Sequence, residues 1–285
     1  MATPYTRPSR ITCKCIQTRL VNKAETFIYT KSKIEPATYR TTSVCALTDN
    51  ANTYLHKRSG PDPEFEEGAS YILKNVTVST RDGQAHLLVG PATQKFRTAP
   101  LVVTEDAVKA AQDALCPPST PMSGNEDNVY STHGYITLQG QVKKLQKVRM
   151  TRSSIPILNI KLLCGADQLD ISLWKEEALC GLHIGDDVEI THLYSDKVPR
   201  GRESFHSSQY TTVKIKETPQ TKQEIEILGV SQSEDTYTLL STDDEVYTVS
   251  AEFYTGNFTS FIEELPMKIL VEHINNRIVG VTPLL

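Results

Sequence analysis

The chain has 285 residues, with 30 Lys and Arg against 34 Asp and Glu, a formal net charge of −4 and a hydrophobic fraction of 39%. That length allows two or three small domains with separate cores. No apolar run approaches the ~18 residues that suggest a membrane helix, and the opening MATPYTRPSR contains no apolar signal segment, so neither a membrane span nor secretion is expected.

Residues 1–115 are predicted to form a small all-β domain closed by a helix. Strand-like runs separated by turn signals occupy residues 11–21, 41–49, 69–80 and 85–90. Thr104, followed by two acidic residues, is an N-cap signal for a short helix that ends at residue 115. The order of these elements favours an OB-fold barrel. The insertion 57–68, with prolines and charges of both signs, is interpreted either as a loop that borders a groove or as a solvated loop.

Residues 116–129 are predicted to be a linker, because three prolines, a glycine and small polar residues allow no regular element there. A second all-β domain is expected at 130–217, and its Gly140 suits a long, coiled first strand. Two of its loops are basic, and in an OB fold the corresponding loops flank the binding face, although basic loops can also serve solubility alone. The basic residues are Lys147, Arg149 and Arg152 in one loop and Lys197, Arg200 and Arg202 in the other.

The strand-like run 167–174 ends in the only tryptophan of the chain. Three apolar residues alternate with Asp170, Ser172 and Trp174, so a period of two places the tryptophan on the polar face of the strand. An indole on the open face of an OB barrel is well placed to stack on a base of single-stranded nucleic acid. The alternative is that Trp174 is a buried core residue, as a lone tryptophan most often is.

The run LWKEEA at residues 173–178, followed by Gly-Asp at 185–186 and a strand, resembles the tandem OB domains of the replication protein A large subunit. In that family an aromatic residue at the end of the third strand stacks on a base, and a second one from the late hairpin stacks on a neighbouring base. The resemblance implies these roles for Trp174 and Phe205. Counting back by twos from Val213 and Ile215 places Phe205 on the same side of the strand as these two residues, so its role requires a bulge or a hairpin end between them.

The first domain has no clean counterpart of the tryptophan motif. Alignment of its strands with those of the second domain places His56 opposite Trp174, with Tyr54 two residues earlier on the same face. Either ring could stack on a base. Both could equally be ordinary exposed residues of a sheet.

Residues 218–285 are predicted to form a third, small OB-like barrel from five strand-like runs, with a short helix between the third and fourth. From residue 221 onward this segment holds 3 Lys and Arg against 11 Asp and Glu and carries −8. The segments 1–130 and 131–220 each carry +2. An acidic barrel would repel phosphates, so a protein-binding or packing role is expected for it.

The sequence contains no phosphate-loop, dinucleotide-binding or metalloprotease motif, and its histidines are dispersed. The carboxylate clusters at 186–187 and 243–245 lie in predicted turns, where Asp is favoured for local hydrogen bonds. The six cysteines lack paired CxxC spacing and indicate neither disulfides nor the zinc ribbon that one OB domain of the replication protein A large subunit carries. No enzymatic activity, cofactor or metal is therefore expected.

These features together predict an all-β protein of tandem OB-fold barrels with short helices, which binds single-stranded DNA with limited sequence specificity. The residues expected to contact phosphate or base edges are Lys161, Lys175, Arg149, Arg152, Arg200 and Arg202. The resemblance implies a nuclear protein of DNA replication, repair or recombination. Two alternatives stay open: an OB-fold adaptor whose acidic third domain binds protein partners in a genome-maintenance complex, and a single-stranded RNA binder.

Overall fold

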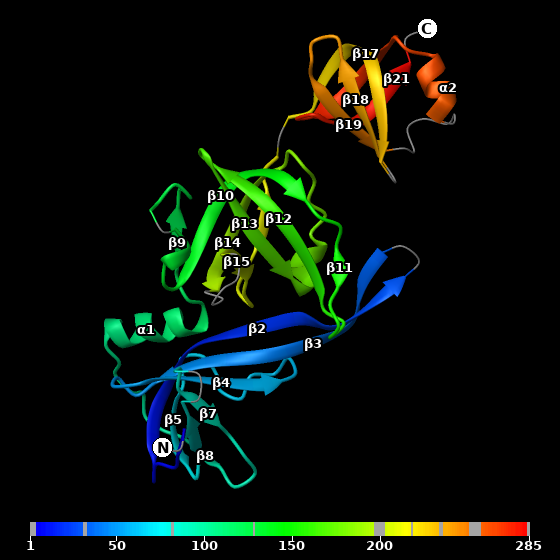
Figure 1. Cartoon of the computed structure of the whole chain (residues 1–285). Coiled ribbons are helices and arrows are strands. Elements are labelled where there is room, and N and C mark those ends of the chain that lie inside the picture. Colours follow the sequence, from blue (N-terminus) through cyan, green and yellow to red (C-terminus); the bar gives the residue numbers. More distant parts are fainter. Residues whose placement is uncertain are drawn as a thin grey trace. The chain divides into compact units, whose positions relative to one another are not determined.

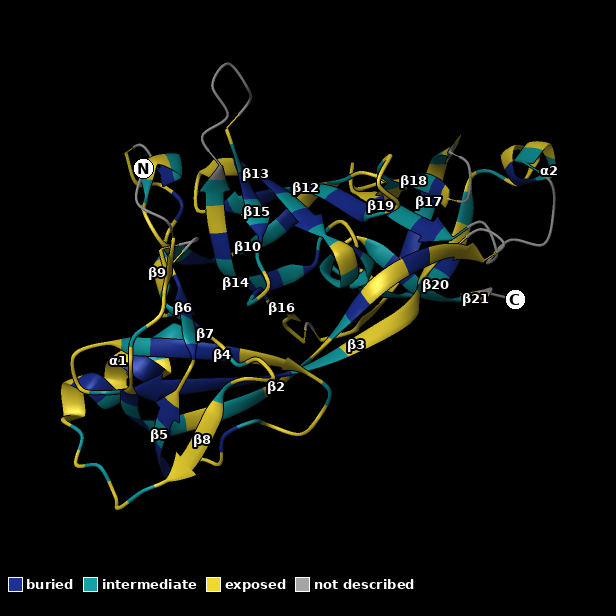
Figure 2. Cartoon of the chain, turned by 90° about the horizontal axis from the view of Figure 1, so that it is seen from below, coloured by how far each residue is buried: buried dark blue, intermediate teal, exposed yellow. Residues whose placement is uncertain are grey.

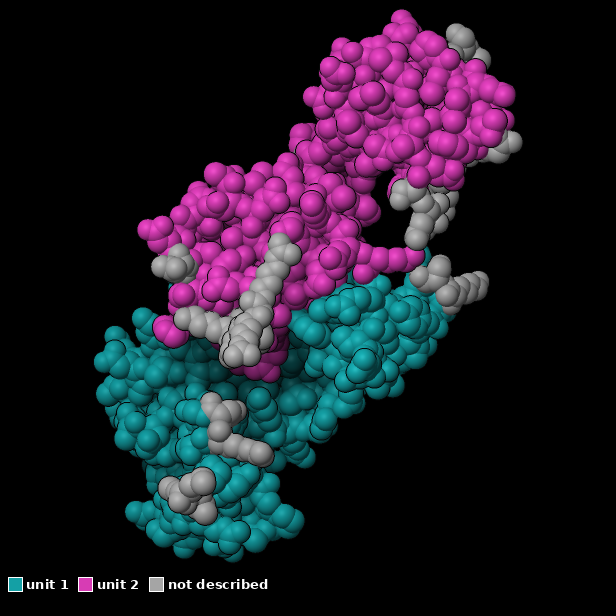
Figure 3. All heavy atoms as spheres, viewed as in Figure 1, with its two compact units in different colours: residues 1–120, 148–157, 174–179 teal, residues 121–147, 158–173, 180–285 magenta. Residues whose placement is uncertain are grey.

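The computed structural model describes residues 4–30, 33–80, 83–127, 129–196, 203–217, 219–233, 236–250 and 258–283 (Figure 1). The chain divides into two compact units, formed by residues 1–120, 148–157 and 174–179 and by residues 121–147, 158–173 and 180–285 (Figure 3). The described strands form three separate sheets. No helix among the described residues is both long and apolar enough to span a bilayer.

The first sheet has eight strands in the order β1-β6-β7-β4-β3-β2-β5-β8. Its strands are β1 (Tyr5–Thr6), β2 (Ile11–Thr30), β3 (Lys33–Thr48), β4 (Thr53–Ser59), β5 (Ser70–Lys74), β6 (Thr77–Ser79), β7 (His86–Leu88) and β8 (Gln94–Arg97). β5 and β6 are separated by only two residues and together take the place of one barrel strand. β5 pairs with β2, and β6 pairs with β7. All four residues of β8, at the edge of the sheet, are exposed (Figure 2).

β2 and β3 form a hairpin that is longer than the strands predicted from the sequence. β2 has 20 residues and β3 has 16, and their pairing continues to Thr30 opposite Lys33. The first residues of β2 alternate inward and build the core, whereas Ile28 and Tyr29 near the hairpin end are exposed. The sequence pattern ended the strand at residue 21 because the outer part of the hairpin lacks regular apolar alternation.

The predicted helix of the first domain is confirmed as α1 (Glu105–Leu115). Its N-cap is Thr104, whose Oγ1 accepts a hydrogen bond from the backbone N–H of Ala107 at 3.2 Å. This bond satisfies one of the donors that a first turn leaves unpaired. The helix packs against β3 and β4 through a buried cluster of Val44, Ala46, Leu55, Ala111 and Leu115. α1 therefore covers the outer face of these two strands.

The second sheet contains β9 (Ser119–Met122), β10 (Tyr135–Leu145), β11 (Arg149–Met150), β12 (Pro156–Cys164), β13 (Asp167–Trp174), β14 (Asp187–Asp196), β15 (Ser204–Ser207) and β16 (Val213–Ile215), with the 3-10 turns η1 (Val129–Ser131) and η2 (Lys175–Leu179). The order is β11-β12-β13-β15-β14-β10-β9, and an added pairing of β10 with β12 closes a ring of five strands. The close approach of β10 to β12 requires a glycine at position 140, because a Cβ there would collide with the backbone oxygen of Leu163.

The prediction that residues 116–129 contain no regular element is wrong. β9 lies within that segment and pairs with β10 at the edge of the second sheet. Prolines are tolerated in an edge strand because one side of the strand needs no hydrogen-bond partner, and Pro121 lies in this edge strand.

The third sheet is a closed barrel in the order β17-β18-β19-β21-β20, as the sequence predicted. Its elements are β17 (Thr221–Ser233), β18 (Thr236–Ser241), β19 (Val246–Ser250), α2 (Phe258–Glu263), β20 (Met267–Ile274) and β21 (Arg277–Pro283). Alternate residues of the strands, such as Ile225, Ile227 and Val271, fill the interior, and Phe261 of the predicted helix packs against them. The helix between the third and fourth strands is also confirmed.

The three sheets share one connectivity. In each sheet, the first barrel strand (β2, β10 or β17) pairs with the second (β3, β12 or β18) and with the fourth (β5, β14 or β20). The third barrel strand (β4, β13 or β19) runs parallel to the fifth (β7, β15 or β21). The parallel pairs are Leu55 with His86, Ile171 with Phe205 and Thr248 with Arg277. A five-stranded Greek-key barrel of this kind is the OB fold, which confirms the predicted fold class.

Candidate nucleic-acid interface

β13 has the alternation that the sequence predicted. Leu169, Ile171 and Leu173 are buried in the barrel, and the residues between them face outward and are partly exposed. The outward residues are Asp170, Ser172 and Trp174. The outer faces of the second and third strands are where OB folds bind oligonucleotides, and in this barrel those strands are β12 and β13.

A row of polar side chains crosses this outer face. The amide nitrogen of Asn159, on β12, donates a hydrogen bond to Oε1 of Gln146 at 3.0 Å. Oγ of Ser172, on β13, donates to the amide oxygen of Asn159 at 2.9 Å. Both ends of the Asn159 amide are therefore held, so its orientation is fixed before any ligand arrives.

The row continues onto β15 and β14, where it becomes aromatic. His206 lies opposite Ser172 in the parallel pairing of β13 with β15, and Tyr194 lies opposite His206 on β14. Residues paired across strands project from the same face of a sheet. The rings of Tyr194 and His206 are 5.8 Å apart between centroids, and Tyr194 is 39% exposed. The sequence did not predict these two residues as part of the site, because each is one of many aromatic residues scattered along the chain.

Two lysines and one carboxylate lie beside the row. Nζ of Lys161 is 3.0 Å from Oδ1 of Asp170, and the side chains are 23% and 26% exposed. Lys144, which is exposed, lies opposite Lys161 in the pairing of β10 with β12. An ion pair with this exposure contributes about 0 to 1 kcal/mol, so Lys161 can exchange its partner at little cost.

A cavity of about 290 Å³ opens among these residues. Lys144, Lys161 and Asp170 supply its charged groups, and Asn159 and Gln146 add amides. Leu145 and Ile184 supply apolar walls, whereas the side chain of Ile160, which also borders the cavity, is 2% exposed and lies in the barrel core. Apolar walls with a few convergent polar groups are typical of a small-molecule or base-binding site.

The other predicted residues of the second barrel have varied positions. Trp174 is the last residue of β13 and is partly exposed, and Lys175, which follows it, is exposed and has a positive φ of 57°. Arg149, on β11, and Arg152, in the turn before β12, are both exposed. The second basic loop, with Lys197, Arg200 and Arg202, lies outside the described residues.

The expectation that Phe205 stacks on a base is wrong for this structure. Phe205 is 0% exposed, and its ring stacks on that of Tyr130 at 4.7 Å between centroids. β15 is paired on both sides without a bulge at Phe205, so the strand keeps its alternation and the ring points into the core. The neighbouring residue, His206, faces outward in its place.

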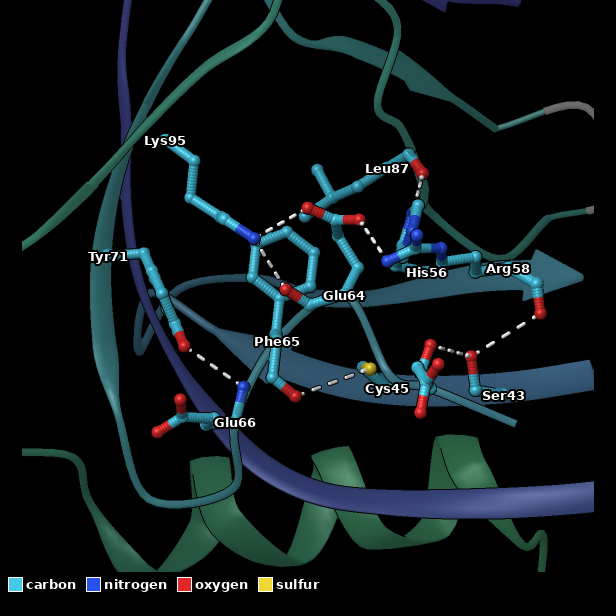
Figure 4. Close-up of polar contacts among 11 residues, drawn as sticks. Ser43, Cys45, His56, Arg58, Glu64, Phe65, Glu66, Tyr71, Leu87 and Lys95 are labelled. Atoms are coloured by element: carbon cyan, nitrogen blue, oxygen red, sulfur yellow. Dashed lines mark hydrogen bonds and ion pairs between the residues drawn. The ribbon is translucent and has the colours of Figure 1, made fainter. Parts of the chain in front are cut away.

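The expectation for Tyr54 and His56 is also wrong, because both side chains point into the first barrel and are buried. The hydroxyl of Tyr54 donates to Oδ2 of Asp49 at 2.8 Å, and Nδ1 of His56 lies 2.9 Å from the carbonyl oxygen of Leu87 (Figure 4). Burial lowers the pKa of His56. The prediction put these side chains on the wrong face because a slip of one residue in a strand alignment exchanges the two faces. The outward residue is Leu55, which α1 covers.

The insertion 57–68 packs onto the first barrel. Its Phe65 is fully buried, with ring centroids 5.4 Å from His56 and 5.2 Å from Tyr71 (Figure 4). The thiols of Cys15 and Cys45 donate to the carbonyl oxygen of Phe65 at 3.9 and 3.8 Å. The loop therefore inserts a ring where an apolar interior needs to be filled.

Ion pairs hold this loop at its outer side. Glu64 lies 2.5 Å from Nζ of Lys95 and 2.9 Å from a guanidinium nitrogen of Arg58 (Figure 4). Burial alone would raise the pKa of Glu64, but these two cations outweigh it and lower the pKa. Among the described residues, no three His, Cys, Asp or Glu side chains are grouped as metal ligands would be.

No family model matches the chain, and no curated protein sequence matches it. Among solved structures, the Ifi202 HINa domain in complex with 20-base-pair double-stranded DNA is 14% identical, covering 74% of this chain and 98% of that one, with a TM-score of 0.37. The p204 HINb domain is 7% identical, covering 75% and 100%, with a TM-score of 0.41. A replication protein A heterotrimer bound to single-stranded DNA is 8% identical, covering 99% and 95%, with a TM-score of 0.35. Similarity at this level assigns no function, which has to come from the residues of the site.

Proposed function

We propose that the second barrel binds single-stranded DNA across the outer faces of β12, β13, β15 and β14. The observation that carries the proposal is the continuous outer row of Asn159, Ser172, His206 and Tyr194 on the binding face of an OB fold. Aromatic rings on such a face stack bases of any sequence, at about 1 to 3 kcal/mol per base. Trp174, two residues beyond Ser172 on the same side of β13, extends the stacking surface.

The charges beside the row suit a phosphate backbone. Lys144 and Lys161 outnumber the single carboxylate of Asp170. Arg149, Arg152 and Lys175 are further exposed cations of the same barrel. Because residues 131–220 carry only +2 in all, stacking supplies a large part of the affinity. Arg200 and Arg202 remain predicted phosphate contacts.

The first barrel contributes less than the sequence suggested. Its Tyr54 and His56 are inside the barrel, and α1 occupies the outer face of β3 and β4. The proposed DNA site is therefore confined to the second barrel. The proposed role, that of a single-stranded DNA-binding protein of DNA replication, repair or recombination in the nucleus, is supported by the resemblance of residues 173–178 and 185–186 to the replication protein A large subunit.

Fluorescence anisotropy of labelled oligomers tests this function. The full chain is titrated against oligo-dT, oligo-rU and a DNA duplex at low and high salt. Oligo-dT is expected to bind most tightly, and its affinity should fall linearly with the logarithm of the salt concentration, because bound phosphates release counterions. Tighter binding of oligo-rU would identify RNA, and not DNA, as the ligand. Failure of all three ligands to bind would refute the function.

One observation favours a second function, that of an adaptor. Residues 221–285 carry −8 on a complete OB barrel, a charge that repels nucleic acid and suits a basic protein surface. In that case the chain would bind a protein partner through the third barrel. Deletion of residues 219–285 would then abolish partner binding and leave oligo-dT affinity unchanged.

A further inference from the structure

The outer face of the second barrel contains a carboxylate, which phosphate binding does not explain. Asp170 projects from β13 beside Lys161 and lines the 290 Å³ cavity. A carboxylate repels phosphates and accepts hydrogen bonds only, so a ligand that meets it favourably must offer donors. In a single strand of DNA, the donors that its internal nucleotides offer are the N–H groups of the bases.

We propose that this cavity binds one guanine base of the single strand and that Asp170 and Lys161 read its Watson–Crick edge. This inference rests on the proposed function and names the base that the site prefers. The cavity volume lies near the lower end of the ~300 to 1,000 Å³ of small-ligand sites, a scale that suits one base.

The order of donors and acceptors selects guanine. The edge of guanine presents the acceptor O6 and then two neighbouring donors, N1–H and N2–H. Nζ of Lys161 lies 3.0 Å from one carboxylate oxygen of Asp170. The ammonium can donate to O6, and the neighbouring carboxylate can accept from N1–H and N2–H. Cytosine and adenine offer one amino group on this edge, and thymine offers one imino N–H between two acceptors. Guanine alone can donate twice to one carboxylate.

The rest of the cavity suits a flat heterocycle. Leu145 and Ile184 provide apolar surface for the ring faces. Lys144 lies opposite Lys161 across β10 and β12 and can meet the phosphate of the same nucleotide. The fixed amide of Asn159 limits rearrangement of the wall when the base enters. A base taken out of the stack and read on this edge is an established mode of recognition.

The test compares oligomers that differ at one position, using the full chain and anisotropy of labelled DNA. The ligands are oligo-dT and the same oligomer with a single central dG, dA, dC or deoxyinosine. A bidentate contact discriminates by about 1 to 3 kcal/mol, so dG should bind roughly 5- to 150-fold more tightly than dT. Deoxyinosine, which lacks the N2 amino group, should lose most of this preference.

Asp170→Asn should remove the preference for dG while it retains or strengthens binding of oligo-dT, because a negative charge leaves the phosphate-binding face. The matched control is Asp167→Asn, which neutralises an exposed carboxylate at the start of the same strand. Equal affinity of the dG and dT oligomers for the unaltered chain, with oligo-dT still bound, would overturn the guanine site and leave the proposed function standing. Absence of binding to every oligomer would overturn both.

Discussion

Replacement of Tyr194 by alanine tests whether the outer row of the second barrel binds bases. The ring is 39% exposed and its centroid lies 5.8 Å from that of His206, so it packs on its neighbour without being part of the core. Loss of one stacked base costs about 1 to 3 kcal/mol, which corresponds to a roughly 5- to 150-fold weaker affinity for oligo-dT. The variant should stay folded, because Tyr194 lies on the outer face and not in the barrel core.

Two further variants separate stacking from other effects. Tyr194→Phe keeps the π face and should bind oligo-dT as the unaltered chain does, because stacking does not need the hydroxyl. Tyr29→Ala removes a more exposed tyrosine, 62% against 39% for Tyr194, from the β2–β3 hairpin and should leave affinity unchanged. Anisotropy titration measures the affinities, and thermal unfolding checks the fold. An unchanged affinity of a folded Tyr194→Ala variant would refute the reasoning.

Two predictions concern the first barrel. Phe65→Ala should cost about 3 to 5 kcal/mol, because it empties the position of a fully buried ring, and hydrogen exchange of β2 and β5 should then accelerate strongly; unchanged exchange would show that the loop does not support the barrel. Because burial lowers the pKa of His56 below its ordinary 6.5, the unfolded chain binds the proton first, and stability should fall as the pH drops below about 6.5. In His56→Asn, thermal unfolding should depend less on pH between 7 and 5, and an equal dependence would contradict the assignment.

The features that the sequence predicted well are local ones. The alternation of β13 needs only a period of two, and it placed Trp174 and Asp170 on the outer face correctly. The cap of α1 needs only Thr104 and the residues that follow it. The third barrel could be predicted because its strands are short, regular and separated by clear turns.

The errors arose where a side chain's position depends on distant strands. The faces of Tyr54 and His56 depend on register, which an alignment by eye shifted by one residue. Phe205 points inward because β13 and β14 hold β15 on both sides without a bulge. Counting by twos in the sequence argued against an outward ring, but only the pairing shows that no bulge reverses it. For the same reason His206 and Tyr194 could not be found, since their place beside Ser172 exists only in the folded sheet.

The packing partner of α1 also could not be predicted from the sequence. Its apolar residues indicate that one side is buried, but they do not say against which strands. Only the structure shows that this side covers β3 and β4, the face on which an OB fold binds oligonucleotides. That observation moves the proposed DNA site to the second barrel alone.

Quenching of the fluorescence of Trp174 by oligo-dT tests the central claim most directly, because this is the only tryptophan of the chain and it ends the strand on which the site is built. We expect saturable quenching that weakens as salt is added, since stacking and phosphate contacts occur together on this face. Binding of oligo-dT, seen by anisotropy, without any change in the fluorescence of Trp174 would place the DNA elsewhere and contradict the account.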